Sequence, residues 1–263
     1  MNKLMYLYEY ELKRNIKAYL AVIALICVSL FLLILNNLNN YNYVIKEVFK
    51  NKSIENTIGF ATFGNIIPSC AVVIFIIGLL ICNLYSFIIW RKDFSGKNKS
   101  IYTLLMIPEN RMKIYISKLL NIVSFTYMFI IAFVATLFVS YCLLSEKMSG
   151  DTISFGFAQD TIYKFGSIIP YNFIDFIVGY VLLLTATISF IFTLILLNKS
   201  IKKCSAILKL ILFTVLIYFW IGIIVTTFFF SKNVILGTIL YSSITIVVCF
   251  FISKNILNNK IEF

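Results

Sequence analysis

Six long apolar stretches constrain the fold of this 263-residue chain more than any other feature. A helix rises about 1.5 Å per residue, so about 20 mostly apolar residues are needed to cross the roughly 30 Å hydrocarbon core of a bilayer. Barrel strands are excluded, because they alternate in polarity over about ten residues. The sequence therefore predicts an all-α integral membrane protein, one transmembrane domain over residues 1–263, with six transmembrane helices. Their approximate limits are 19–35, 66–89, 119–144, 173–197, 208–230 and 234–252.

The distribution of lysine and arginine predicts the orientation. Seventeen of the 23 basic residues fall on the side that holds both termini and the loops after the second and fourth spans, and six fall on the other side. Basic residues are retained in the cytoplasm, so we expect the N- and C-termini to be cytoplasmic. This topology and contact with anionic lipid headgroups account for the net charge of +12, and nucleic acid is not needed to explain it.

The segment before the first span has an amphipathic pattern. Four apolar residues alternate with charged ones, which is typical of a short helix lying in the membrane interface. An ordinary charged flank of the first span explains the pattern equally well. We expect no signal-peptide cleavage, because the first apolar run ends in asparagines rather than in small residues. The four apolar residues of the predicted interfacial helix are Leu4, Leu7, Leu12 and Ile16.

The chain offers little for catalysis or metal binding. It contains no histidine, and its six cysteines form no C-x-x-C pair. Cysteine and tyrosine apart, the ionisable residues within the proposed spans are Asp175 and Lys209, each near the start of its span. We therefore predict no catalytic, cofactor or metal site in this chain. Hydroxyl and small residues recur every four positions at 132–140 and 185–193, which favours close helix packing and, secondarily, a substrate path.

The loop between the second and third spans carries the most specific pattern, and seven of the basic residues lie between Trp90 and Lys118. Trp90, Arg91 and Lys92 have the composition of an interfacial anchor. The apolar run 101–107 is too short to span a bilayer, so it either docks a protein partner or dips into the headgroups.

A helix beginning at Pro108 and ending at Leu144 would be about 55 Å long. Such a helix is roughly 25 Å longer than the hydrocarbon core. We therefore expect its first part, with Arg111, Lys113 and Lys118, to project into the cytoplasm or to bend along the interface.

The six-span pattern and the loop sequence D-x(10)-LL-x(2)-P-x(2)-R-x(6)-K resemble the ABC-2 family of ABC transporter permease subunits. The overall pattern covers nearly the whole chain, and the loop motif covers about 30 residues. The motif positions here are Asp93, Leu104, Leu105, Pro108, Arg111 and Lys118. The chain departs from larger relatives between its fifth and sixth spans. Only Ser231, Lys232 and Asn233 connect these spans, which leaves no room for re-entrant extracellular helices.

The resemblance implies that the loop contains a coupling helix that docks on a separate cytoplasmic ATPase subunit, which would hold the ATP and Mg²⁺. This chain would then be a non-enzymatic permease subunit of an exporter in a bacterial cell membrane, paired with a second copy or a paralogue. Apolar and hydroxyl groups in the spans would suit an amphipathic or lipid-like substrate, such as a membrane-active peptide. The residues expected to couple to the ATPase are Ile101, Leu104, Leu105, Pro108 and Arg111.

Two other functions remain open from the sequence. One is a channel or secondary carrier that works without an ATPase. The other is a non-transporting scaffold or sensor that uses the same loop to recruit a cytoplasmic partner.

Overall fold

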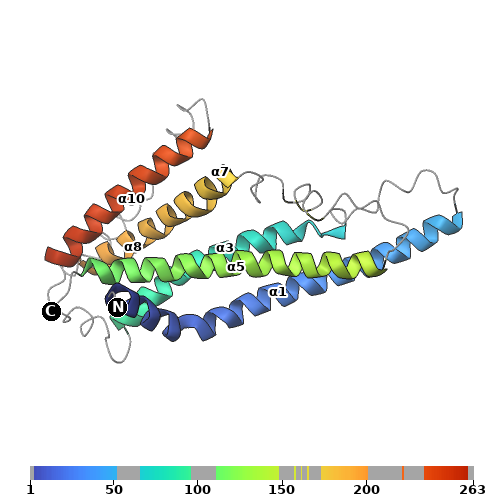
Figure 1. Ribbon diagram of the computed structural model, residues 1–263, viewed down its shortest axis with the longest axis horizontal. Helices are drawn as coiled ribbons and strands as arrows, with labels where there is room; N and C mark the ends of the chain where they lie inside the picture. The colour runs from blue at the N-terminus through green and yellow to red at the C-terminus, as the bar shows by residue number, and fades with distance from the viewer. Residues whose placement is uncertain are drawn as a thin grey trace. The chain divides into compact units, whose positions relative to one another are not determined.

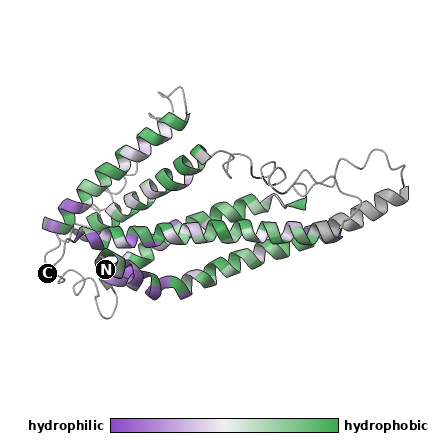
Figure 2. Cartoon of the chain, in the orientation of Figure 1, coloured by the Kyte–Doolittle hydropathy of each residue, from purple (hydrophilic) through white to green (hydrophobic). Residues whose placement is uncertain are grey.

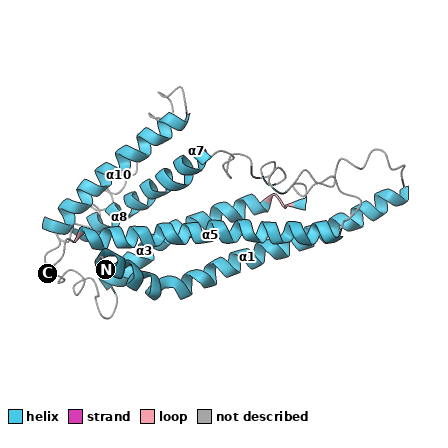
Figure 3. Cartoon of the chain, in the orientation of Figure 1, coloured by secondary structure: helices cyan, strands magenta, loops and turns pink. Residues whose placement is uncertain are grey.

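The computed structural model describes residues 3–51, 66–95, 111–147, 173–200 and 234–259, together with residues 157, 161, 165 and 221. Within these residues the structure is helical apart from short loops such as 67–69, and it has no strand (Figure 3). The helices labelled in Figure 1, with the π-helical segment η4 between α7 and α8, are as follows. They are α1 (Lys3–Asn51), α3 (Cys70–Ser95), α5 (Met112–Lys147), α7 (Phe173–Phe176), η4 (Ile177–Leu183), α8 (Leu184–Ser200) and α10 (Val234–Asn259).

Five helical segments are long and apolar enough to cross a membrane, which fits a multi-pass membrane protein. They are Leu4–Asn37, Cys70–Phe94, Met112–Leu143, Ile177–Asn198 and Ile235–Asn258. Figure 2 shows apolar residues along most of each helix, with hydrophilic residues gathered at the start of α1. These segments coincide with five of the six predicted spans. The remaining predicted span, 208–230, lies outside the described residues except for Ile221.

The helices extend beyond the predicted spans. α1 runs without interruption from Lys3 to Asn51, so the predicted interfacial segment and the first span belong to one helix. No proline or glycine interrupts this stretch, and its Lys, Glu and Leu residues favour a helix whether or not lipid surrounds them. Helix α5 begins at Met112, whereas the predicted start at Pro108 lies outside the described residues.

The fourth span contains a π-helical segment, η4. π-helical geometry is rare and changes the pairing of backbone carbonyls. The Thr185 hydroxyl compensates, since its Oγ1 lies 2.8 Å from the carbonyl oxygen of Val181 and 2.9 Å from that of Leu182. Hydroxyl side chains can therefore satisfy carbonyls within an irregular membrane helix.

The chain divides into two compact units. Unit 1 contains residues 1–14, 82–124 and 172–263, and unit 2 contains residues 15–81 and 125–171. Helices α1, α3 and α5 each contribute one part to unit 1 and another to unit 2, whereas α8 and α10 belong to unit 1 alone.

Unit 2 has an aromatic core. The rings of Tyr19 and Phe125 stack at 3.6 Å between centroids, and Phe75 lies 4.8 Å from Phe133. Helix α3 approaches Phe129 at Gly78, where a Cβ atom would lie only 2.2 Å from the Cζ of that ring. The absence of a side chain at Gly78 is therefore what lets the two helices come this close.

In unit 1, α8 packs against α10. Ser189 and Thr193 of α8 are buried, and the Thr193 hydroxyl lies 3.7 Å from the Cys249 sulfur of α10. Both hydroxyls donate to carbonyls of their own helix. This arrangement is consistent with the predicted role of the 185–193 pattern in helix packing.

Candidate functional site

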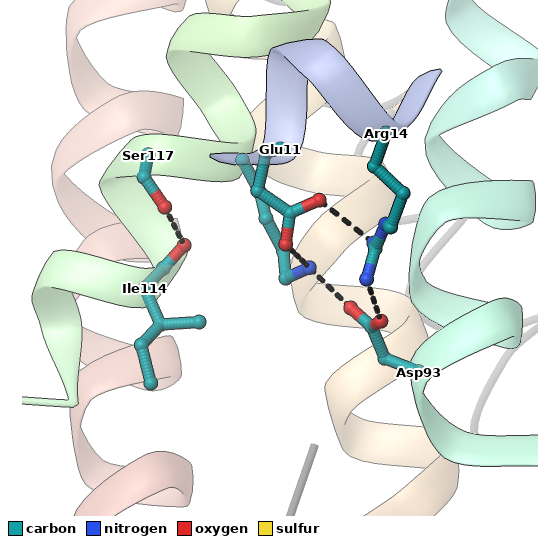
Figure 4. Close-up of polar contacts among 6 residues, drawn as sticks. Glu11, Arg14, Asp93, Ile114 and Ser117 are labelled. Atoms are coloured by element: carbon teal, nitrogen blue, oxygen red, sulfur yellow. Dashed lines mark hydrogen bonds and ion pairs between the residues drawn. The ribbon is translucent and has the colours of Figure 1, made fainter. Parts of the chain in front are cut away.

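Four charged side chains from three helices form a closed ring in unit 1 (Figure 4). We call this group the charge ring. It consists of Glu11 and Arg14 of α1, Asp93 of α3 and Lys118 of α5. Each carboxylate binds both cations, and each cation binds both carboxylates. With two anions and two cations, the ring carries no net formal charge.

The contacts are short enough for charge-assisted hydrogen bonds. The Lys118 Nζ donates to Glu11 Oε1 at 2.6 Å and to Asp93 Oδ2. Arg14 donates through Nη1 to Asp93 Oδ1 at 2.8 Å and through Nη2 to Glu11 Oε2 at 2.7 Å. All four carboxylate oxygens of the ring therefore accept a hydrogen bond from a cation.

The ring is almost entirely buried. Lys118 and Asp93 are 0% exposed, Glu11 is 2% exposed and Arg14 is 24% exposed. Removing a charge from water carries a penalty of several kcal/mol, which an opposite charge with good hydrogen-bond geometry offsets. The four residues therefore depend on one another, and the loss of one leaves an uncompensated buried charge.

Helix α1 positions its acidic residue through a regular stripe. Leu7, Glu11, Asn15 and Tyr19 are all buried and recur every four residues. Residues at this spacing lie on one face of a helix, so Glu11 occupies a core position rather than a solvated one.

On α3, Trp90 is fully buried and stacks edge-on with Phe192, and the Lys118 Nζ lies 5.4 Å from the Trp90 ring centre.

Two further contacts join helices of unit 1. The Ser124 hydroxyl donates to the Leu120 carbonyl, so in the 2.8 Å pair between Tyr8 Oη and Ser124 Oγ the tyrosine is the donor. Arg111, immediately before α5, donates through Nη1 to the carbonyl oxygen of Leu257 at 2.6 Å. Leu257 lies in the last turn of α10, where carbonyls lack partners within the helix, so Arg111 caps that helix.

The contacts of the charge ring are suited to holding helices in place. Its carboxylate oxygens are engaged by cations, and the described residues contain no group of three His, Cys, Asp or Glu side chains able to hold a metal ion. What the ring can do is fix the pairing of the ends of α1, α3 and α5, because charge-assisted hydrogen bonds require specific partners at specific distances.

Comparison with protein-family models, with curated proteins and with solved structures found no match to this chain.

The structure describes some of the predicted site residues and leaves others outside the described ranges. Ile101, Leu104, Leu105 and Pro108 lie outside the described residues. Arg111 is half-buried at the cap of α10. In the predicted interfacial helix, Leu7 is buried, and Leu4, Leu12 and Ile16 are half-buried.

That the first part of α5 projects into the cytoplasm or bends along the interface stays a prediction, although the Lys118 ammonium is held inside the charge ring. One expectation from the sequence is wrong. Trp90 is not an interfacial anchor, because its indole packs in the core beside Phe94 and Phe192. A tryptophan beside two cations at the end of an apolar run is typical of the membrane interface, but this pattern does not distinguish contact with headgroups from burial between helices.

Sequence reasoning also missed Glu11 and Arg14 as members of a site. The signal was present, since Glu11 lies four residues after Leu7 and eight before Tyr19 on the face that continues into the first span. Extending the apolar stripe of that span toward the N-terminus would have placed Glu11 among core positions and required a buried cation to accompany it.

Proposed function

We propose that this chain is the membrane-spanning permease subunit of an ATP-binding cassette exporter. In this proposal both termini face the cytoplasm of a bacterial cell, and a separate subunit binds and hydrolyses ATP. A second permease copy or a paralogue completes the membrane part. The substrate is amphipathic or lipid-like, such as a membrane-active peptide.

The observation that carries the proposal is the pairing of Asp93 with Lys118. These are the first and last positions of the loop motif, and they lie on either side of the loop that would dock the ATPase. The charge ring joins them to each other and to α1. A force applied to the loop would therefore act on the ends of three helices together.

Arg111 extends this connection to a fourth helix. Its bond to the Leu257 carbonyl ties the start of α5 to the end of α10. In the proposed mechanism, ATP binding closes the ATPase subunits and the loops move with them. The ends of α1, α3, α5 and α10 follow, and the permease pair opens outward.

The test is purification of the tagged chain from its native membrane in mild detergent. We expect an ATP-binding cassette ATPase to co-purify. Leu104→Glu or Leu105→Glu would place a charge in a desolvated contact, which typically costs several kcal/mol and weakens binding about a hundredfold or more. Each variant should lose the ATPase and still insert into the membrane.

Lys97→Ala is the matched control, because it lies in the same loop, before the apolar run. It should retain the ATPase. Absence of any ATPase from the wild-type preparation would contradict the proposal. Retention of the ATPase by both glutamate variants would show that the apolar run does not dock it.

A secondary carrier is a second candidate, favoured by one observation. Glu11 and Asp93 are buried carboxylates within helices long enough to cross a membrane, and such residues often relay protons. Against it, each carboxylate is bonded to two cations, so a proton could bind only after the ring opens.

The two candidates differ in their energy source. Uptake of a labelled amphipathic peptide into inverted membrane vesicles should require ATP hydrolysis and survive a protonophore if the chain belongs to an exporter. A carrier would show the reverse dependence, and its uptake would be abolished by Glu11→Gln.

A further inference from the structure

Consecutive residues at the end of α3 face two different environments. Ser86, Ile89, Trp90 and Asp93 are buried and face the core of unit 1. Leu84, Phe87, Ile88, Arg91 and Lys92 form the opposite, exposed face. The helix therefore directs its acidic residue inward to the charge ring and its two adjacent cations outward.

The exposed face is apolar until it reaches the cations. Leu84 is 56% exposed and Ile88 is 45% exposed, with Phe87 beside them. Residues at these spacings form one continuous strip along a helix. Because α3 is long and apolar enough to cross a membrane, this strip is suited to contact with lipid acyl chains.

Arg91 and Lys92 differ from the three cations of unit 1 that are bonded across helices. Arg14 and Lys118 are neutralised in the charge ring, and Arg111 caps α10. Arg91 has no hydrogen bond or ion pair with any residue that the structure describes. The Lys92 Nζ lies 6.0 Å from the ring centre of Tyr85, two turns earlier on α3, so this side chain is directed back along the helix.

We propose that this face of α3 binds an anionic phospholipid. Its acyl chains lie along Leu84, Phe87 and Ile88, and its headgroup phosphate lies between Arg91 and Lys92. Charge complementarity selects the occupant, because two adjacent cations favour a headgroup with net negative charge over a zwitterionic one. The site is independent of transport, since it requires neither an ATPase nor a substrate.

The test is native mass spectrometry of the full-length chain in detergent, titrated separately with phosphatidylglycerol and with phosphatidylcholine. We expect the wild type to bind phosphatidylglycerol more tightly. Each cation near a membrane surface contributes a factor of about five to the attraction of an anionic lipid. Arg91→Gln with Lys92→Gln should therefore weaken phosphatidylglycerol binding about tenfold or more and leave phosphatidylcholine binding unchanged.

Two matched variants complete the experiment. Arg91→Lys with Lys92→Arg keeps both charges and should keep the preference. Lys13→Gln with Lys17→Gln removes two exposed cations from α1 and should leave it intact. Equal losses in the α1 and α3 variants would overturn the proposal, because they would show attraction to net charge alone.

Inorganic phosphate separates a lipid site from a simple anion site. Millimolar phosphate should fail to displace phosphatidylglycerol, because it lacks the acyl chains that contact the apolar strip. Displacement by phosphate, or undiminished lipid binding by the Arg91→Gln and Lys92→Gln variant, would show that this face is not a phospholipid site.

Discussion

Units 1 and 2 share α1, α3 and α5, yet among the described residues these helices bury charged side chains in unit 1 alone. In unit 1 these helices meet through Glu11, Arg14, Asp93 and Lys118. In unit 2 they meet through rings such as Tyr19 on Phe125 and Phe75 on Phe133. A charged contact accepts only a partner of opposite charge, whereas an aromatic contact accepts many apolar groups of suitable shape.

The difference between charged and aromatic contacts suggests that the two units stabilise helix packing in different ways. Lipid chains are as apolar as a leucine-rich helix face, so apolar packing alone discriminates weakly between helix partners in a membrane. A ring of four charges has few alternative arrangements, and it lies at the helix ends that flank the proposed docking loop. Unit 1 should therefore respond to changes of charge, and unit 2 to changes of volume.

The largest expected effect is that of Lys118→Met, which leaves two buried carboxylates facing one guanidinium. Removing one partner of a buried ion pair typically costs about 3–5 kcal/mol. We expect a loss of this size in the free energy of unfolding, measured by SDS titration followed by tryptophan fluorescence. Trp90 is a suitable probe because its ring lies 5.4 Å from the lysine Nζ.

The matched control is Lys113→Met, at a half-exposed position of the same helix, which should have a much smaller effect. Combining Lys118→Met with Asp93→Asn removes one charge of each sign and leaves the Arg14 and Glu11 pair intact. The double variant should be more stable than Lys118→Met alone, a non-additivity expected only for groups in contact. Additive losses would show that the ring is not an energetic unit.

The second largest loss of stability is expected from a change of side-chain volume in unit 2. Gly78→Ala would place a methyl group 2.2 Å from Phe129 Cζ and 2.7 Å from its Cε2, so the ring must move. Overpacking of this kind costs about 1–3 kcal/mol. The same unfolding assay should detect the loss, and Phe129→Leu in the Gly78→Ala background should recover part of it.

Gly179→Ala provides the contrast, because a Cβ atom at that position would meet nothing within 4 Å. It should leave stability unchanged. A loss equal to that of Gly78→Ala would mean that helix geometry, rather than the contact with Phe129, determines the effect.

Five long apolar helices could be predicted from the sequence, but the partners at their ends could not. Bilayer thickness sets a minimum length for an apolar run, and few structures other than a transmembrane helix satisfy it. Charged residues at the ends of such runs are ambiguous, because they can face water or one another. The Lys118 contacts join residues 25 and 107 positions apart, and no local pattern specifies pairings of that range.

The candidate site was therefore found only in part. Asp93, Arg111 and Lys118 were identified through a motif, but their structural roles were not. The sequence did not predict the burial of Lys118 or the bond from Arg111 to α10, and the ATPase contact of Arg111 stays a prediction. Glu11 could have been recognised from its place on the buried stripe of α1, since an isolated buried charge requires a partner.

A smaller effect in unit 1 is expected for Arg111→Gln. This variant loses the guanidinium that caps α10, and a partly exposed bond to a helix carbonyl contributes about 1 kcal/mol. Hydrogen–deuterium exchange should show faster exchange in the last turns of α10, around residues 253–259, with little change in α8. Arg111→Lys retains a cation at the helix end and should show an intermediate rate. Unchanged exchange in Arg111→Gln would show that the cap does not stabilise the helix end.

The smallest effect should come from Lys13→Ala, which tests whether burial, rather than charge alone, makes the ring important. Lys13 and Glu9 form an ion pair at 2.7 Å on α1, close in sequence to Glu11 and Arg14. Their side chains are 74% and 47% exposed, so water and salt screen the interaction. Lys13→Ala should therefore leave the SDS unfolding midpoint within experimental error, and raising the ionic strength should not change this result. A loss comparable to that of Lys118→Met would mean that charge anywhere along the start of α1 supports unit 1, and the distinction between the charge ring and its exposed neighbours would fail.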